Sequence, residues 1–143
     1  MITKNYPPTK TWILVHVIFP MLPFFIEGFA RLIVLDSSLE IVSFSTLAAS
    51  MGLLCLFVNQ NLLAHSIPLS DDDEQDKLIE VTAIFLALGI TNFFLFACIV
   101  FLTANPDIPK KLYLVKSFIF ICAFISIREA YRTQQSYKLR AQI

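Results

Sequence analysis

Long apolar segments separated by short polar ones dominate this chain of 143 residues. An α-helix needs about 20 mostly apolar residues to cross the roughly 30 Å hydrocarbon core of a bilayer. Lipid offers no partner for unpaired backbone groups, so segments of this kind fold as helices. The pattern predicts an all-α integral membrane protein, a single domain over residues 1–143 with four transmembrane helices in a bundle. The expected spans cover residues 12–35, 41–59, 79–104 and 110–128.

The composition fits a chain that lipid partly covers. Hydrophobic residues make up 57% of the chain and charged residues 15%, and the mean hydropathy is +0.71. Soluble domains are about 45–50% apolar and about 25% charged. The formal net charge is zero and the basic residues are spread out, which argues against direct nucleic acid binding. The first apolar run is longer than the core of a signal peptide, so we expect it to be retained.

Lys and Arg residues are unevenly distributed between the two sides of the predicted membrane domain. Four spans place both termini on one side, and the positive-inside rule assigns the more basic side to the cytoplasm. We therefore expect both termini, an acidic loop over 60–77 and a basic tail over 128–143 to be cytoplasmic. Seven basic residues lie on the terminal side (Lys4, Lys10, Lys77, Arg128, Arg132, Lys138, Arg140) and three on the other (Arg31, Lys110, Lys111). Lys116 is left out as intramembrane, near the start of its span, where it can snorkel to the interface.

Polar residues and prolines of the first span recur on one helical stripe. At about 100° per residue, His16, Pro20, Pro23, Glu27 and Arg31 fall within an arc of roughly 80°. Charges in a membrane usually face the bundle interior or a wet cavity, so we expect this stripe to face inward. Glu27 and Arg31 are spaced to pair along the helix, or alternatively to line a pore or sensing cavity. The prolines predict a kink, which is either a packing shape or a hinge. His16 is either an ordinary hydrogen-bonding residue or a proton sensor.

Small residues in the second span predict a close helix contact. Ser45 and Ala49 form one small-x-x-x-small pair, and Ala48 and Gly52 form another. Asn92 lies near the middle of the third span, where an amide is costly unless it is hydrogen-bonded. We interpret it as a helix-to-helix hydrogen bond, with a pore-lining group as the alternative.

The acidic segment between the second and third spans has several possible uses. Its Asp-Asp-x-x-Asp spacing resembles a diphosphate enzyme's magnesium motif, but no second acidic motif accompanies it. It also lacks the glycine and the closing glutamate of an EF-hand. Capping of the following helix is one interpretation. The other is a docking surface for a soluble partner, shared with the basic tail. The candidate docking residues are Asp71, Asp72, Asp73, Glu74, Asp76, Arg128, Arg132, Lys138 and Arg140.

The sequence contains no recognisable catalytic or metal-binding motif. Cys55, Cys98 and Cys122 each lie in an apolar run, and their number is odd. We interpret them as reduced packing residues, with a redox or metal site as the alternative. We expect a protein that is not an enzyme and has no cofactor.

In overall plan the chain resembles KwaA, the membrane subunit family of the Kiwa antiphage defence system. The resemblance lies in four predicted spans, short external loops, no enzymatic motif and an acidic cytoplasmic loop after the second span. The resemblance covers the whole chain, but it assigns a functional role to no individual residue. It implies a homo-oligomer, with a tetramer favoured, in the bacterial inner membrane. It also implies a soluble, DNA-binding partner (KwaB) at the cytoplasmic face.

Two functions follow as hypotheses. In the first, the chain is an oligomeric membrane sensor or anchor that recruits or regulates a cytosolic effector, in antiviral defence. In the second, it is a small ion channel or membrane-disrupting effector, with Glu27, Arg31, Thr91 and Asn92 along the path. A small transporter subunit is a third, more distant alternative, because no inverted repeat is visible.

Overall fold

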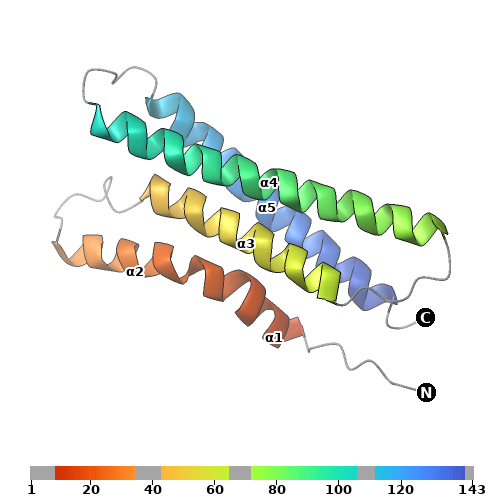
Figure 1. The fold of residues 1–143 in the computed structure, drawn as a ribbon. Helices are drawn as coiled ribbons and strands as arrows, with labels where there is room; N and C mark the ends of the chain where they lie inside the picture. Colours follow the sequence, from red (N-terminus) through yellow and green to blue (C-terminus); the bar gives the residue numbers. More distant parts are fainter. Residues whose placement is uncertain (1–8, 35–42, 65–71, 106–111, 141–143) are drawn as a thin grey trace.

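The computed structural model consists of helices, and it describes residues 9–34, 43–64, 72–105 and 112–140. Successive long helices run in opposite directions, so α1 begins and α5 ends at the same end of the bundle (Figure 1). The predicted all-α class is thus confirmed. In chain order the elements are α1 (Thr9–Ile13), the π-helix η1 (Leu14–Ile18), α2 (Phe19–Val34), α3 (Phe44–Ala64), α4 (Asp72–Ala104) and α5 (Leu112–Arg140).

Within the residues that the structure describes, three helical stretches are long and apolar enough to cross a membrane: Thr11–Val34, Phe44–Leu63 and Asp76–Ala104. The helix α5 is not among them, because Lys116, Arg128 and Glu129 interrupt its apolar sequence. Only 11 residues without charge, 117–127, separate Lys116 from Arg128. The structure therefore supports a membrane protein with three candidate spans, and the fourth span at 110–128 stays a prediction.

The helices extend beyond the predicted spans on the side of the termini. The helix α3 continues to Ala64 instead of ending at residue 59, and buried Leu62 packs in this extension. The helix α4 begins at Asp72, so residues 72–77 belong to a helix and the predicted 60–77 loop is shorter than expected. Acidic residues favour a helix N-terminus, which explains why α4 starts within the acidic segment. The predicted tail is helical as far as Arg140.

The first helix changes its winding before the first of its two prolines. Pro20 has no N–H group, so the carbonyl of residue 16 has no partner four residues on. Over Leu14–Ile18 the helix adopts π winding, and the N–H of Phe19 donates to the carbonyl of Leu14, five residues back. Pro23 lies inside α2. A proline-induced kink, with hinge motion, stays a prediction.

The helix α3 is the centre of the bundle. It packs against α2, α4 and α5, and its contact with α4 is the most extensive. Met51, Leu54 and Cys55 of α3 are fully buried, together with Phe85 of α4 and Ile119 of α5. The core thus lies on the α3–α4–α5 side, and α2 covers one flank of it.

Candidate functional site

Glu27 and Arg31 of α2 form the ion pair that their spacing predicts. Nε and Nη2 of Arg31 donate to Oε1 of Glu27 at 3.0 and 2.7 Å. The side chain of Glu27 is 33% exposed and that of Arg31 is 39% exposed. The pair therefore lies at the edge of the bundle, where it contacts the next helix but still reaches the surface.

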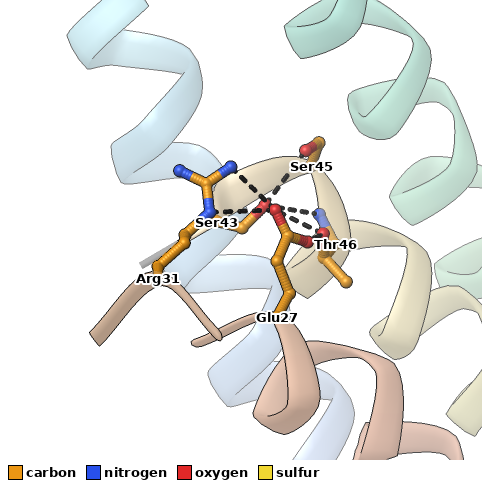
Figure 2. Close-up of polar contacts among 5 residues, drawn as sticks. All are labelled: Glu27, Arg31, Ser43, Ser45 and Thr46. Carbon is orange, nitrogen blue, oxygen red and sulfur yellow. Dashed lines mark hydrogen bonds and ion pairs between the residues drawn. The ribbon is translucent and has the colours of Figure 1, made fainter. Parts of the chain in front are cut away.

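The other carboxylate oxygen of Glu27 joins α2 to the N-terminus of α3. Oγ1 of Thr46 donates to Oε2 of Glu27. Oγ of Ser43, the residue before α3, accepts from the N–H of Thr46 at 3.4 Å and lies 2.8 Å from its hydroxyl. Figure 2 shows the carboxylate pointing between Arg31 and this first turn. Anionic groups are favourable at a helix N-terminus, so the Ser43 cap and the Glu27 carboxylate both stabilise the N-terminus of α3.

A third charge lies near the start of α3. The ammonium group of Lys116, on α5, lies 5.1 Å from the centre of the Phe44 ring, a cation–π distance. The ring of Phe44 also meets the ring of Phe120 edge-on at 5.3 Å. The structure places the charge of Lys116 over an aromatic face, and the expected snorkelling to the membrane interface stays a prediction. One carboxylate and two cations therefore gather at this end of the bundle.

The predicted inward stripe of the first span is only partly inward. Pro20 is buried, and His16, Glu27 and Arg31 are half-buried, but Pro23 is exposed. The helix α2 packs mainly against one helix, and its buried side is centred between Pro20 and Met21. At about 100° per residue, Pro23 lies roughly 100° from that centre. Its predicted inward position is therefore wrong, because a helix with one neighbour buries a narrow arc.

The side chain of His16 is engaged with its own helix. Its Nδ1 lies 3.1 Å from the carbonyl oxygen of Trp12, and the two rings stack with centres 5.2 Å apart. Trp12 is buried. This arrangement supports the interpretation of His16 as an ordinary hydrogen-bonding residue.

Asn92 makes the helix-to-helix hydrogen bond that was expected of it. The residue is fully buried, and its Nδ2 donates to Oγ of Ser126 on α5 at 3.2 Å and to the carbonyl of Leu88 at 2.8 Å. The hydroxyl of Ser126 donates in turn to the carbonyl of Cys122 at 2.8 Å and lies beside Cys55 of α3. This buried group therefore fixes the register of α5 against α4 inside the core.

Of the small residues of α3, Gly52 lies against α4. Ala48 and Gly52 are buried, whereas Ser45 and Ala49 are half-buried. A Cβ atom added to Gly52 would lie 2.9 Å from the ring of Phe93 on α4, and one added to Gly89 would lie 3.5 Å from Cys55. Glycine thus permits the close approach of these two helices at Gly52.

The charged ends of α4 and α5 form a shallow groove of about 290 Å³. Both ends lie at the end of the bundle where α1 begins (Figure 1). Inside the groove, Arg132 and Glu129 form an ion pair at 3.3 Å. The groove is lined by Lys77, Leu78, Glu80, Val81, Glu129, Arg132, Thr133 and Ser136.

Of the predicted docking residues whose side chains the structure describes, Asp76, Arg128 and Arg132, only Arg132 lines this groove. Asp76 and Arg128 are exposed on α4 and α5, outside the groove lining. Asp72, Asp73 and Glu74 lie in the first turns of α4, and Lys138 and Arg140 in the last turns of α5. Asp71 lies outside the described residues.

Sequence reasoning missed several polar residues that complete these sites. Ser43 and Thr46 were overlooked, although a serine directly before an apolar run is a signal for the start of a helix. Glu80 and Glu129 were overlooked because each is a single acidic residue beside a longer charged segment. No sequence signal indicates that Ser126 is the partner of Asn92, since 34 residues separate them.

Within the described residues, no group of three or more His, Cys, Asp or Glu side chains is placed to hold a metal ion. Comparison of the chain with protein-family models, with curated proteins and with solved structures finds no match. The function is therefore inferred from the contacts of Glu27 and Asn92 and from the groove between the charged ends of α4 and α5.

Proposed function

We propose that the chain is a four-pass protein of the bacterial inner membrane that anchors a soluble effector at the cytoplasmic face. The observation that carries this proposal is the joint extension of α4 and α5 beyond their apolar segments. At about 1.5 Å per residue, the 33 residues of α4 measure about 50 Å, against roughly 30 Å of hydrocarbon. The first turns of α4, which exceed the length needed to cross the hydrocarbon, lie beside the charged end of α5. The two helix ends form a groove there.

The charges of this groove suit a protein partner better than a nucleic acid. Lys77 and Arg132 contribute two positive charges to its lining, and Glu80 and Glu129 contribute two negative ones, so the two signs are balanced. Nucleic acid sites are dominated by positive charge. Complementary charges of both signs fix the register of a protein partner and suppress wrong ones. The proposal includes a homo-oligomer and a role in phage defence, which the resemblance to the Kiwa membrane subunit suggests.

The test is affinity purification from the native host in a mild detergent, with the mass of the complex and the identity of every co-purifying chain. We expect a stoichiometric soluble protein, with binding lowered roughly tenfold or more by the double change Glu80→Lys and Arg132→Glu. Lys111→Glu, a charge reversal in a segment expected on the opposite side, serves as the control and should retain the partner. A partner retained by both variants would remove the groove from the proposal.

A small ion channel is the second candidate, and the half-exposed Glu27–Arg31 pair favours it. This pair reaches the surface of α2, where a second copy of the chain could complete a polar path. Asn92, in contrast, is closed off in the core, which supports a packing role for that residue. A homo-oligomer that purifies without any partner and conducts ions in liposomes, with conductance changed by Glu27→Gln, would support the channel over the anchor.

A further inference from the structure

The outer surface of α5 has a much shorter apolar band than that of α4, and the two helices are neighbours. The residues without charge between Lys116 and Arg128 number 11, which is about 17 Å of helix. On α4 the uncharged stretch from Val81 to Ala104 is about 36 Å long. A tilted α4 can match a flat bilayer of roughly 30 Å, whereas the apolar band of α5 is too short for it.

The hydrogen bond between Asn92 and Ser126 shows at which end of the bundle the uncharged stretches of α4 and α5 stop at different levels. These side chains lie 3.2 Å apart, so the two residues are at nearly the same depth. From Ser126 towards the end of α5, the first charge is Arg128, about 3 Å further along the axis. From Asn92 towards the start of α4, the first charge is Glu80, about 18 Å away. On the side where the chain begins and ends, the polar boundary of α5 is therefore about 15 Å deeper than that of α4.

Arg128 interrupts an exposed apolar stripe of α5. Phe120 and Phe124, eight and four residues before it, are 53% and 70% exposed. Tyr131, the next residue of this surface, is 58% exposed. Arg128 is itself exposed, and it has no hydrogen-bond or ion-pair partner within the described parts of the chain. Arginine and tyrosine side by side at the end of an apolar stripe are typical of the lipid–water interface.

We propose that Arg128 binds phospholipid phosphate and draws the headgroup layer inwards along α5, so that the bilayer is locally thinned on this flank. A charged guanidinium in lipid is stabilised by water and headgroups that move towards it, because leaving it in hydrocarbon is costly. A guanidinium group frequently binds phosphate through two parallel hydrogen bonds. A protein shorter than its bilayer thins it, and here only one flank is short. The inference rests on the proposed fourth pass through α5 and not on the soluble partner.

The test compares the water accessibility of matched positions on α4 and α5. Counted from the Asn92–Ser126 hydrogen bond, Tyr131 and Ala87 each lie five residues towards the same side, and both are exposed. Each is changed to cysteine, as is Phe124, in a chain carrying Cys55→Ala, Cys98→Ala and Cys122→Ala. The full chain is reconstituted in opened vesicles of phosphatidylcholine and phosphatidylglycerol and treated with a charged, water-soluble thiol reagent.

We expect Tyr131→Cys to react roughly tenfold or more faster than Ala87→Cys, because thiols react as thiolates in water. Phe124→Cys should react slowly. Adding Arg128→Leu should slow the reaction of the thiol in Tyr131→Cys roughly tenfold. Adding Arg128→Lys should not slow it, because lysine also holds headgroups through its charge. If the triple alanine background elutes as an aggregate in detergent, buried Cys55 and Cys122 are retained and only Cys98 is replaced.

Three results would overturn the proposal, and they are distinguishable. Equal, slow labelling at positions 131, 87 and 124 means that the bilayer is flat around a membrane-embedded α5. Labelling of Phe124→Cys as fast as that of Tyr131→Cys means that α5 does not cross the membrane, so the proposed fourth pass fails as well. An unchanged rate on adding Arg128→Leu means that Arg128 does not hold the headgroup layer.

Discussion

The first helical segment, α1–η1–α2, and the central helix α3 have similar apolar sequences but opposite positions in the fold. In the apolar stretch of the first segment 11% of the residues are buried within the chain, against 50% in α3. Both stretches are long and apolar enough to cross a membrane. Their difference shows that hydrophobicity places a helix in lipid, whereas small residues and polar contacts decide how tightly it packs.

The two segments also use their polar groups differently. In α3 the buried side packs glycine, alanine and cysteine against neighbours on α4 and α5. The helix α2 contacts the rest of the bundle mainly on the side that packs against α3. The carboxylate of Glu27 reaches the N-terminal cap of α3. The first segment is therefore attached mainly to one neighbour, α3.

The largest expected effect comes from truncating matched leucines in the two segments. Leu54 of α3 is fully buried and Leu32 of α2 is 57% exposed. We expect Leu54→Ala to lower the free energy of unfolding by about 2–5 kcal/mol, because it leaves a cavity in the core. Leu32→Ala should change it by less than about 1 kcal/mol. Unfolding titrations in mixed detergent micelles measure both, and equal losses would contradict the assignment of α2 to the periphery.

Overpacking of the α3–α4 contact is the next largest effect. Gly52→Leu should lower the free energy of unfolding by about 1–3 kcal/mol, because the ring of Phe93 occupies the space that the new side chain needs. Gly89→Ala is the control, since its Cβ would meet Cys55 at an ordinary contact distance of 3.5 Å. Alanine also favours the helix by about 1 kcal/mol relative to glycine. The same titration applies, and a more stable Gly52→Leu variant would show that α3 and α4 are further apart.

The link between α2 and α3 is tested by Thr46→Val. The change removes the hydroxyl that donates to Glu27 but keeps the size of the side chain. We expect a loss of about 1–3 kcal/mol, since a carboxylate loses one of its donors. Spin labels on α2 and α3 should report a broader distance distribution between these helices. Thr103→Val is the matched control, because the hydroxyl of Thr103 bonds only to carbonyls of its own helix. Similar broadening in the control would argue against the link.

The smallest effect is expected for the Asn92–Ser126 hydrogen bond. A double-mutant cycle with Asn92→Ala and Ser126→Ala should give a coupling energy of about 0.6 kcal/mol, the average for such bonds in membranes. The cycle isolates the pair from the cavities that each change leaves. A coupling of zero would mean that the two side chains do not share a hydrogen bond in the folded protein.

Much of the fold was predictable because apolar length is a strong signal. The all-helical class, the existence of the long helices and the pairing of Glu27 with Arg31 follow from periodicity and spacing. The helix ends were less predictable, since packing of Leu62 and the acidic start of α4 lengthen the helices beyond the predicted spans. The candidate sites were predicted in part: the sequence indicated Glu27, Asn92 and Arg132 but not their partners Thr46, Ser126 and Glu129.

The sequence by itself determined that this protein is helical, suited to a membrane and charged at the ends of its last two helices. These properties depend on the chemistry of short segments, which is visible without a fold. Only the tertiary structure decided that α3 is central and α2 peripheral, that Glu27 meets the cap of α3, and that Arg128 lies about 3 Å along the helix axis from the Asn92–Ser126 hydrogen bond. Those facts depend on register and rotation between helices far apart in the chain, which many weak contacts set together.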